Sequence, residues 1–314
     1  MKNIISAFLI LNSLFIYGQE FKIITDTINI PDNGRLVDVA FFKNELYVMF
    51  DTKRRNTNGR FKSMKVFDLN AEFVENVFLP EYAVSMFYCD LRVNNSQLYL
   101  KQEHSFSGKT FLLENYVADF NEINNTRINI FEDENYIIYP NCNGEWGAST
   151  IFKNKKTNLA YEFASTCNYN IIGTDRGYLI TIGNEIKIIE NPEKLYKSDF
   201  KFDISYSEKE NQGVKTLFTS DFKIYTTTEV NGNLYVLYGN ETNSYFGKLK
   251  TDRIEKLIEF DKPYKFSDWF KDDKGNQILK MYSYDSIDYG LMEGYKNLGF
   301  ILINGQNLRM YHRK

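Results

Sequence analysis

Histidine and cysteine are scarce in this chain. Among 314 residues there are two histidines, His104 and His312, and three cysteines. Histidine-based catalytic triads and zinc sites need several of these residues at matched spacings, and no such spacing occurs. The sequence also lacks a G-x-S-x-G nucleophile motif, a P-loop and a dinucleotide-binding glycine fingerprint. We therefore expect no metal ion, no cofactor and no histidine-based catalysis.

The chain also has little proline, little net charge and no long apolar run after its first residues. Five prolines argue against a disordered or linker-rich chain. A net charge of −3 gives no electrostatic reason to expect a nucleic acid partner. No segment of the mature chain approaches the roughly 20 apolar residues that a membrane span needs. We expect a monomeric mature chain without a transmembrane span.

The N-terminus has the three parts of a secretory signal. Lys2 precedes an apolar run over residues 4–17, and the small Gly18 follows it. Such a run is short for a membrane helix and typical of a cleaved signal peptide. We predict a signal peptide over residues 1–19 and an exported chain, either periplasmic or secreted. No cysteine follows the run, so a lipid anchor is not expected.

A short turn followed by an apolar, aromatic strand recurs along the chain. Aromatic residues make up 16% of the sequence, which favours strands over helices. Recurring units of this size are typical of repeat architectures. We predict one all-β domain over residues 20–314. It is an antiparallel β-propeller of about four strands per blade, with five blades favoured, six as the alternative and a β-sandwich pair as the rival fold. The copies of the turn lie at residues 43–48, 95–100, 176–180, 231–237 and 274–279.

Residues 35–80 show one blade most clearly. Strands are predicted at 36–42, 45–50, 64–68 and 73–79, with turns at Lys43-Asn44 and Asn70 and a basic loop over 52–62. An early strand at residues 21–30 is predicted to pair with a C-terminal hairpin at residues 300–311. This pairing would close the ring and remove exposed strand edges.

A predicted hairpin at residues 142–167 contains two of the three cysteines. If its turn is centred on Asn154 and Lys155, Cys142 faces Cys167 and the apolar side chains share one face. An exported chain meets oxidising conditions, so we predict a Cys142–Cys167 disulfide with Cys89 as a free thiol. On this register one face is core and the other solvated. The core face carries Trp146, Thr150, Leu159, Tyr161 and Phe163, and the solvated face carries Glu145, Lys153 and Glu162.

Parts of this hairpin and of the C-terminus resemble a known group of proteins. Residues 142–147, 152–157 and 164–167, with 289–294 and 300–305, are similar to exported, functionally uncharacterised proteins of Bacteroidota with propeller-like folds. Residues 16–19 resemble the ends of signal peptides from the same bacteria. The resemblance implies export and a propeller, and it transfers no catalytic residue.

Acidic and aromatic residues gather near the C-terminus. Asp268, Asp285 and Asp288 lie near Trp269, and paired acids beside aromatic rings are what glycoside hydrolysis requires. Solvated turns have the same composition, and that is the reading we favour here.

A second group of candidate residues is basic. Arg54 and Arg55 lie in the predicted loop of the first blade and could hold an acidic glycan by bidentate contacts. We predict a non-catalytic binding protein whose partner is a glycan or an envelope protein. The alternatives are a carbohydrate-active enzyme that uses Asp/Glu pairs and a structural envelope protein.

Overall fold

The computed structural model describes most of the chain after residue 20. The described ranges are 21–28, 34–53, 60–85, 89–94, 96–102, 110–121, 131–142, 148–165, 170–198, 212–271, 275–283 and 297–313. The signal peptide predicted over residues 1–19 therefore lies outside the described residues and stays a prediction.

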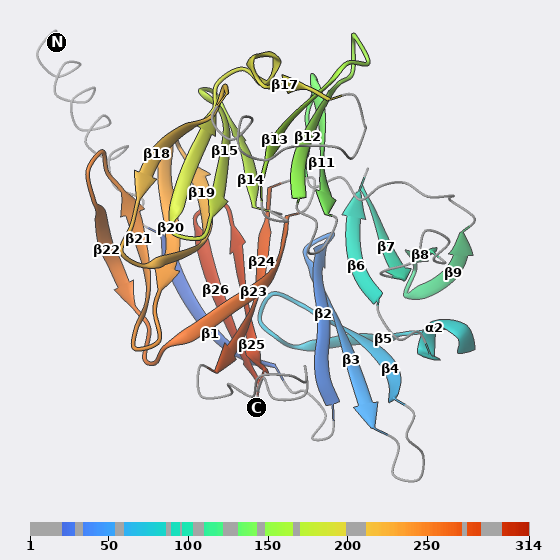
Figure 1. The fold of residues 1–314 in the computed structure, drawn as a ribbon. Helices are drawn as coiled ribbons and strands as arrows, with labels where there is room; N and C mark the ends of the chain where they lie inside the picture. The colour runs from blue at the N-terminus through green and yellow to red at the C-terminus, as the bar shows by residue number, and fades with distance from the viewer. Residues whose placement is uncertain are drawn as a thin grey trace, which may run out of the picture.

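The described residues form six small antiparallel sheets in a ring, a six-bladed β-propeller (Figure 1). Blade 1 consists of β2 (Gly34–Phe42), β3 (Glu45–Lys53), β4 (Arg60–Phe67) and β5 (Phe73–Val77), and helix α2 (Glu81–Ser85) follows it. Blade 2 consists of β6 (Cys89–Asn94), β7 (Gln97–Gln102), β8 (Thr110–Glu114) and β9 (Val117–Asn121). Blade 3 consists of β10 (Phe131–Glu132), β11 (Tyr136–Cys142), β12 (Ala148–Asn154) and β13 (Ala160–Ala164), with β17 (Tyr196–Lys197) at its edge.

The other three blades come from the second half of the chain. Blade 4 consists of β14 (Ile171–Thr174), β15 (Gly177–Ile182), β16 (Glu185–Ile189) and β18 (Lys215–Thr219), with the 3-10 helix η2 (Pro192–Lys194) after β16. Blade 5 consists of β19 (Lys223–Val230), β20 (Asn233–Gly239), β21 (Ser244–Leu249) and β22 (Ile254–Glu259). Blade 6 consists of β23 (Tyr264–Lys271), β24 (Gln277–Ser283), β25 (Asn297–Asn304) and β26 (Asn307–Arg313), with β1 (Lys22–Ile28) at its edge.

The blade count is six, the stated alternative, and the preference for five was wrong. Each turn copy found in the sequence joins the first two strands of a blade. The copy in blade 3 at residues 133–138 was missed, although Tyr136 directly follows its turn just as Tyr178 follows the turn of blade 4. The backbone N–H of Asp133 donates to the carbonyl of Tyr136, which closes this turn as in the other blades. The conserved feature is thus the tight turn, whereas the tyrosines occupy different positions in their strands.

The predicted closure of the ring is confirmed. Strand β1 pairs in parallel with β26, from Lys22 opposite Asn307 to Ile28 opposite Arg313. Figure 1 shows the blue N-terminal strand beside the red C-terminal blade. The two ends of the chain are therefore tied into one sheet, and the hydrogen bonds of that sheet hold the ring closed.

Hydrophobic clusters fill the spaces between neighbouring blades. Among the described residues, separate clusters join blades 1 and 2, 3 and 4, 4 and 5, 5 and 6, and 6 and 1. Their largest members are fully buried rings such as Phe152, Phe246 and Phe300. Burial of one such side chain contributes about 1.5–3 kcal/mol. The propeller thus has a core distributed around the ring, in the spaces between neighbouring blades.

The predicted hairpin of residues 142–167 differs from the structure in both its strands and its register. Cys142 ends β11, and β12 lies between β11 and β13, so Cys142 is not on the strand that pairs with β13. In the observed register Phe152 pairs with Tyr161 rather than with Thr157. The side chain of Asn154 accepts hydrogen bonds from the backbone N–H groups of Lys156 and Thr157, which moves the turn beyond the predicted centre.

The corrected register bears on the predicted disulfide and on the predicted orientation of Trp146. The register that motivated the disulfide is wrong. Cys167, Glu145 and Trp146 lie outside the described residues, and so do the side chains of Cys142 and Cys89, so the disulfide and the orientation of Trp146 stay predictions.

Two residues of the hairpin have the opposite burial from the predicted one. Glu162 was assigned to the solvated face but is only 3% exposed, and it accepts a hydrogen bond from Ser149. Leu159 was assigned to the core face but lies in the turn and is exposed. Glu162 is buried because neighbouring blades cover both faces of a propeller sheet, so alternation along a strand does not separate core from solvent. Leu159 is exposed because it precedes β13, which begins at Ala160.

Candidate functional site

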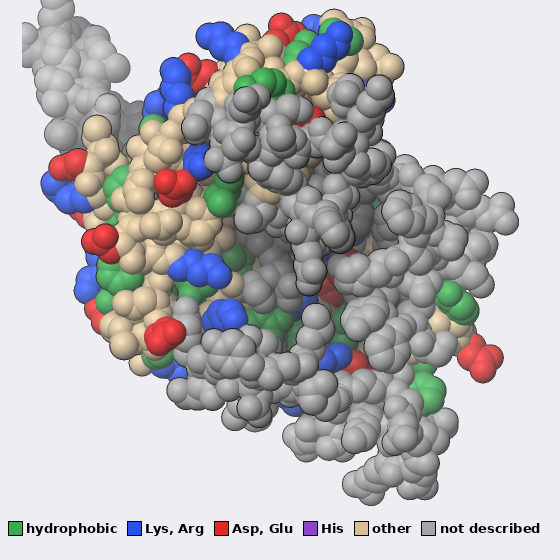
Figure 2. Space-filling view, in the orientation of Figure 1, with side chains coloured by type: hydrophobic (Ala, Val, Ile, Leu, Met, Phe, Trp, Pro, Cys, Tyr) green, Lys and Arg blue, Asp and Glu red, His purple; other side chains and the backbone are tan. Residues whose placement is uncertain are grey.

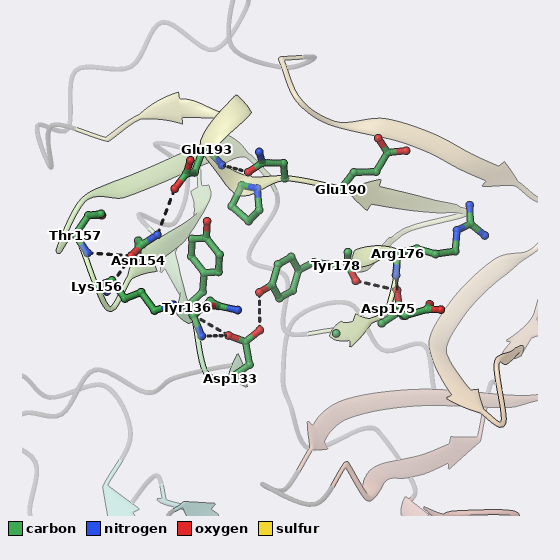
Figure 3. Close-up of a pocket in the computed structure, with 16 residues that line it drawn as sticks. Asp133, Tyr136, Asn154, Lys156, Thr157, Asp175, Arg176, Tyr178, Glu190 and Glu193 are labelled. Atoms are coloured by element: carbon green, nitrogen blue, oxygen red, sulfur yellow. Dashed lines mark hydrogen bonds between the residues drawn. The ribbon is translucent and has the colours of Figure 1, made fainter.

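A groove of about 640 Å³ lies between blades 3 and 4. Its walls come from the β10–β11, β12–β13 and β14–β15 turns and from the segment that follows β16 (Figure 3). The lining is mainly polar. The residues are Asp133, Asn135, Tyr136, Asn154, Lys156, Thr157, Gly173, Thr174, Asp175, Arg176, Gly177, Tyr178, Glu190, Asn191, Pro192 and Glu193.

One wall is a strap that crosses from blade 4 to blade 3. After β16 the chain forms η2, and β17 then pairs with β13 of blade 3 before β18 returns to β16 of blade 4. The backbone N–H of Ser198 donates to the carbonyl of Ala160, and the buried Leu195 joins the cluster between the two blades. Asn191 caps η2 by accepting from the N–H of Glu193. The strap is therefore anchored on both blades.

The floor of the groove is built around Asp133 and two tyrosines. One carboxylate oxygen of Asp133 accepts from the backbone N–H groups of Asn135 and Tyr136, at 2.7 and 2.8 Å. The other oxygen accepts from the Tyr178 hydroxyl at 2.5 Å, which links blade 3 to blade 4 (Figure 3). Tyr136 and Tyr178 are each 8% exposed, and their rings meet edge to face. Burial, and then the hydrogen bond to Asp133, raise the pKa of Tyr178 above its usual value.

Asn154 holds the other side of the floor. Its side-chain oxygen accepts from the β12–β13 turn, and its amide nitrogen lies 3.4 Å from a carboxylate oxygen of Glu193 on the strap. It also hydrogen-bonds Tyr136, whose pKa is raised by burial despite that bond. Asn154 is 8% exposed, so these contacts lie largely out of water. One buried amide thus ties the turn, the floor and the strap together.

The β14–β15 turn on the opposite wall requires a glycine. Gly177 has a φ of +123°, and a Cβ there would lie 2.4 Å from the carbonyl oxygen of Ile189 on β16. Thr174 accepts from the N–H of Arg176 and donates to the carbonyl of Gly177. The turn is therefore rigid and presents Asp175 and Arg176 at the rim.

A second polar cluster lies where the inner strands of blades 6, 1 and 2 meet. Asp38 on β2 accepts from the backbone N–H of Leu91 on β6 at 2.7 Å. Lys280 on β24 lies 3.7 Å from Asp38 and donates to the carbonyl of Val37, which a β-bulge places out of register. Arg92 lies 3.8 Å from Asp38 and also pairs with Asp90.

Asp38 is strongly perturbed by this setting. Burial raises its pKa, Lys280 opposes the shift, and the charge of Asp90 adds to it. Asp38 is 5% exposed, so its interactions are with protein groups rather than with water. The cluster joins three blades through one carboxylate.

The sequence-predicted site residues lie elsewhere. Asp268 and Trp269 are in β23 of blade 6, at the two positions where the pairing with β24 shifts register, and their side chains are not described. Arg54 and Arg55, between β3 and β4, and Asp285 and Asp288, between β24 and β25, lie outside the described residues. None of these six residues lines the groove between blades 3 and 4.

The basic loop predicted over residues 52–62 is shorter in the structure. Strand β3 extends to Lys53 and β4 begins at Arg60. Lys62 is 6% exposed and lies opposite the buried Asp51 in the register of β3 and β4, and Asp51 binds Arg35 at 3.1 Å. Lys62 therefore belongs to a charge ladder within blade 1 and not to a solvated loop.

The groove residues were missed because they are dispersed over 61 positions of the chain, from Asp133 to Glu193. One signal could have found part of the site. Residues 133–138 are a copy of the repeated turn, and recognising this copy would have placed Tyr136 and Tyr178 at the same end of adjacent blades.

Other kinds of site were sought in the described part of the chain. None of its helices is long and apolar enough to cross a membrane. No group of three or more His, Cys, Asp and Glu side chains suitable for a metal ion occurs among the described residues. On the face drawn in Figure 2, acidic and basic side chains of described residues are interspersed.

Comparison with known proteins yields similarity of overall arrangement alone. No family model and no curated protein matches the chain. Hsv2 of Kluyveromyces lactis is 10% identical over 86% of this chain and 90% of its own, with a TM-score of 0.37. The catalytic domain of a GH62 α-L-arabinofuranosidase from Coprinopsis cinerea is 11% identical over 90% and 96%, with a TM-score of 0.31. A Trypanosoma rangeli sialidase is 10% identical over 90% and 57%, with a TM-score of 0.39.

Glycoside hydrolases of family GH43 also occur among the similar structures, at 8–9% identity. Because every one of these TM-scores is low, the similarity carries no argument about activity. The class to which this chain is assigned, a six-bladed antiparallel β-propeller, follows from its own strand pairing.

Proposed function

We propose that the protein is a glycan-binding propeller and that its binding site is the groove between blades 3 and 4. The observation that carries this proposal is a groove of about 640 Å³ whose hydroxyl, amide and carboxylate groups come from two blades. Ligand sites in proteins typically measure about 300–1,000 Å³ and place a few polar groups on a rigid frame. A sugar presents many hydroxyls, and each can both donate and accept, so it matches such a lining.

Preorganisation supports the same proposal. Asp133, Asn154 and Tyr178 are held by hydrogen bonds to groups of the protein, and the strap is anchored on both blades. A ligand that binds to fixed groups loses less affinity to the ordering of side chains.

The test uses a steric block at the rim. Thr157 is exposed in the β12–β13 turn, and Thr242 is exposed in the β20–β21 turn of blade 5, where its backbone N–H and hydroxyl donate to Asn240. We expect Thr157→Trp to weaken binding of a glycan identified on a glycan array by at least tenfold, and Thr242→Trp to leave it unchanged. Isothermal titration calorimetry measures both. Absence of any glycan ligand, or equal binding by Thr157→Trp and the parent chain, would refute the proposal.

A second candidate function, a carbohydrate-active enzyme, is favoured by the Asp38–Asp90 cluster. A glycosidase needs one carboxyl with a raised pKa to protonate the leaving group and a second, ionised carboxylate. Burial raises the pKa of Asp38, while Asp90 is paired with Arg92 at 2.5 Å.

This candidate is tested by product formation. Release of reducing ends from array-positive glycans by the parent chain, reduced at least 100-fold in Asp90→Asn with an unchanged melting temperature, would support an enzyme. No release by the parent chain leaves the non-catalytic reading in place.

We further propose that the chain is exported after cleavage near Gly18, in line with its resemblance to exported Bacteroidota proteins. The tripartite N-terminus motivates this part of the proposal. Mass spectrometry of the extracytoplasmic fraction should find a mature chain that begins near Gln19. Detection of intact Met1 there would contradict it.

A further inference from the structure

The carboxylates that line the groove differ from their neighbours in how their charge is balanced. Among the described residues, the side-chain carboxylate of Asp133 accepts from neutral donors, two backbone N–H groups and the Tyr178 hydroxyl. Glu193 faces the neutral amide of Asn154. Within the described part of the chain, no Lys or Arg nitrogen lies within 4 Å of a carboxylate oxygen of Asp133, Asp175 or Glu193, although Lys155 donates to the backbone carbonyl of Asp133 at 2.6 Å. Within the described residues, three carboxylates of the groove therefore lack an ion pair with a Lys or Arg side chain.

Other carboxylates in and beside the groove have their charge balanced by a lysine. Glu132 pairs with Lys155 at 2.6 Å, and Glu185 pairs with Lys187 at 3.2 Å. Glu190, which lines the groove, pairs with Lys215 at 2.7 Å, and that contact lowers the pKa of Glu190. Among the described residues, the same two blades thus supply cations to these acids but not to the other three acids of the groove.

The two cationic residues that line the groove, Lys156 and Arg176, do not pair with its carboxylates. Lys156 and Arg176 lie on exposed turns, and neither makes an ion pair within 4 Å of a carboxylate among the described residues. Figure 3 shows Arg176 extending away from Tyr136 and Tyr178. The groove has a negative charge that a bound ligand can balance.

We infer that the ligand of this groove is a sugar with a free, protonated amine, an amino-sugar glycan rather than an acidic one. This inference rests on the proposed function. An ammonium group has three hydrogen-bond donors and no acceptor, which suits carboxylates that lack a cation. Hydrogen bonds between charged partners are about twice as strong as neutral ones.

Other occupants fit the same groove less well. A uronic acid would add a like charge beside Asp175 and Glu193, which is unfavourable at any dielectric constant. A bare metal ion does not account for a cavity of about 640 Å³, and the described residues contain no suitable cluster of metal ligands. A sugar amine combines the required positive charge with hydroxyls that the two tyrosines and Asn154 can bind.

The experiment compares four probes by isothermal titration calorimetry with the complete mature chain. They are a fully deacetylated glucosamine hexamer, its N-acetylated counterpart, a galacturonic acid hexamer and spermine. We expect the deacetylated hexamer to bind at least tenfold more tightly than the N-acetylated one and to weaken as salt is raised. Glu193→Gln and Asp175→Asn should each weaken that binding about three- to tenfold. Glu241→Gln, at an exposed turn of blade 5, is the matched control and should have no effect.

Each outcome decides a separate question. Equal binding of both glucosamine hexamers would overturn the inference and keep the glycan-binding function. Binding of spermine as tightly as the deacetylated hexamer would show a site for amines in general and overturn the sugar assignment. Failure of every oligosaccharide would overturn the proposed function as well. Unchanged binding in both groove variants would place the site elsewhere on the molecule.

Discussion

Single hydrogen bonds connect blades that are otherwise joined by apolar packing. The Tyr178 hydroxyl of blade 4 donates to Asp133 of blade 3, and both side chains line the groove. Tyr178 also packs against Phe131, Tyr136 and Phe152 of blade 3. The residue therefore contributes both buried area and a charged hydrogen bond to one blade interface.

Removing the Tyr178 hydroxyl tests the contribution of its hydrogen bond separately from that of its buried ring. We expect Tyr178→Phe to reduce the free energy of unfolding by about 1.5–3 kcal/mol, the range for hydrogen bonds to charged groups. Tyr99→Phe is the control, because the Tyr99 hydroxyl bonds the neutral Gln97 within its own blade, and it should cost about 0.5–1.5 kcal/mol. Urea denaturation measures both. An equal cost in the two variants would show that the link between blades adds nothing.

Individual strands depend on close approach of their backbones. Gly299 in β25 has a φ of +138°, and a Cβ there would lie 1.9 Å from the carbonyl oxygen of Tyr311 in β26. Gly183, between β15 and β16, has a φ of +60° with open space around the position of a Cβ. The first glycine is required by contact and conformation together, and the second by conformation alone.

These two glycines give a matched test at the level of the strand. We expect Gly183→Ala to cost about 1–2 kcal/mol, the strain of a left-handed alanine. Gly299→Ala should cost more than about 3 kcal/mol, since the added methyl group meets a backbone atom that cannot rotate away. Thermal or urea denaturation of purified variants measures the difference. A smaller loss for Gly299→Ala than for Gly183→Ala would contradict the observed pairing of β25 with β26.

The whole molecule depends on the closure of its ring. Strand β1 contributes the closing edge of blade 6, and its residues differ widely in burial. Ile28 is 1% exposed and joins the cluster between blades 6 and 1, whereas Ile23 is 45% exposed. Closure is therefore held by the end of β1 that reaches the core, together with the parallel ladder to β26.

A comparison within this one strand tests the closure. We expect Ile28→Ala to cost about 2–5 kcal/mol by leaving a cavity between two blades. Ile23→Ala should change stability by no more than about 0.5 kcal/mol. Equilibrium denaturation followed by tyrosine fluorescence measures both. Similar small effects would mean that β1 does not hold the ring.

The closure should also depend on pH through His312 in β26. Burial lowers its pKa below the ordinary 6.5, while Asp261 acts in the opposite direction. Because the unfolded chain then binds a proton more readily, the stabilising effect of neutral His312 is present above about pH 6.5 and is lost as the pH falls toward the folded pKa. We expect stability to decline over that window in the parent chain and to decline less in His312→Gln. Parallel slopes in denaturation midpoints from about pH 7 to pH 5 would contradict this assignment.

Much of the fold was predictable because it depends on local chemistry. The turn at Lys43-Asn44 has φ angles of 51° and 64°, which match the left-handed turn that asparagine-containing pairs favour between strands. The four strands of blade 1 and the pairing of the N-terminal strand with the C-terminal hairpin were also predicted correctly. The blade count failed because the copy of the tight turn at residues 133–138, with Tyr136 directly after the turn, was not recognised.

The candidate site was not predictable in the same way. Asp133, Asn154 and Glu193 are ordinary turn residues in the sequence and become a groove only because blades 3 and 4 lie side by side and the strap crosses between them. The burial of Glu162 and Lys62 was equally unpredictable from the sequence, because both are charged residues and both are buried in the folded chain.

By itself, the sequence determined the strand content and the tight turns, because these follow from hydrogen bonding and side-chain preferences over a few residues. It also indicated the closure, because a ring of repeated sheets leaves exposed edges unless its first and last strands pair. The tertiary structure alone decided the number of blades, the burial of charged side chains and the position of the groove. These properties depend on which sheets become neighbours in the ring, and that is settled by the packing of apolar side chains from distant parts of the chain.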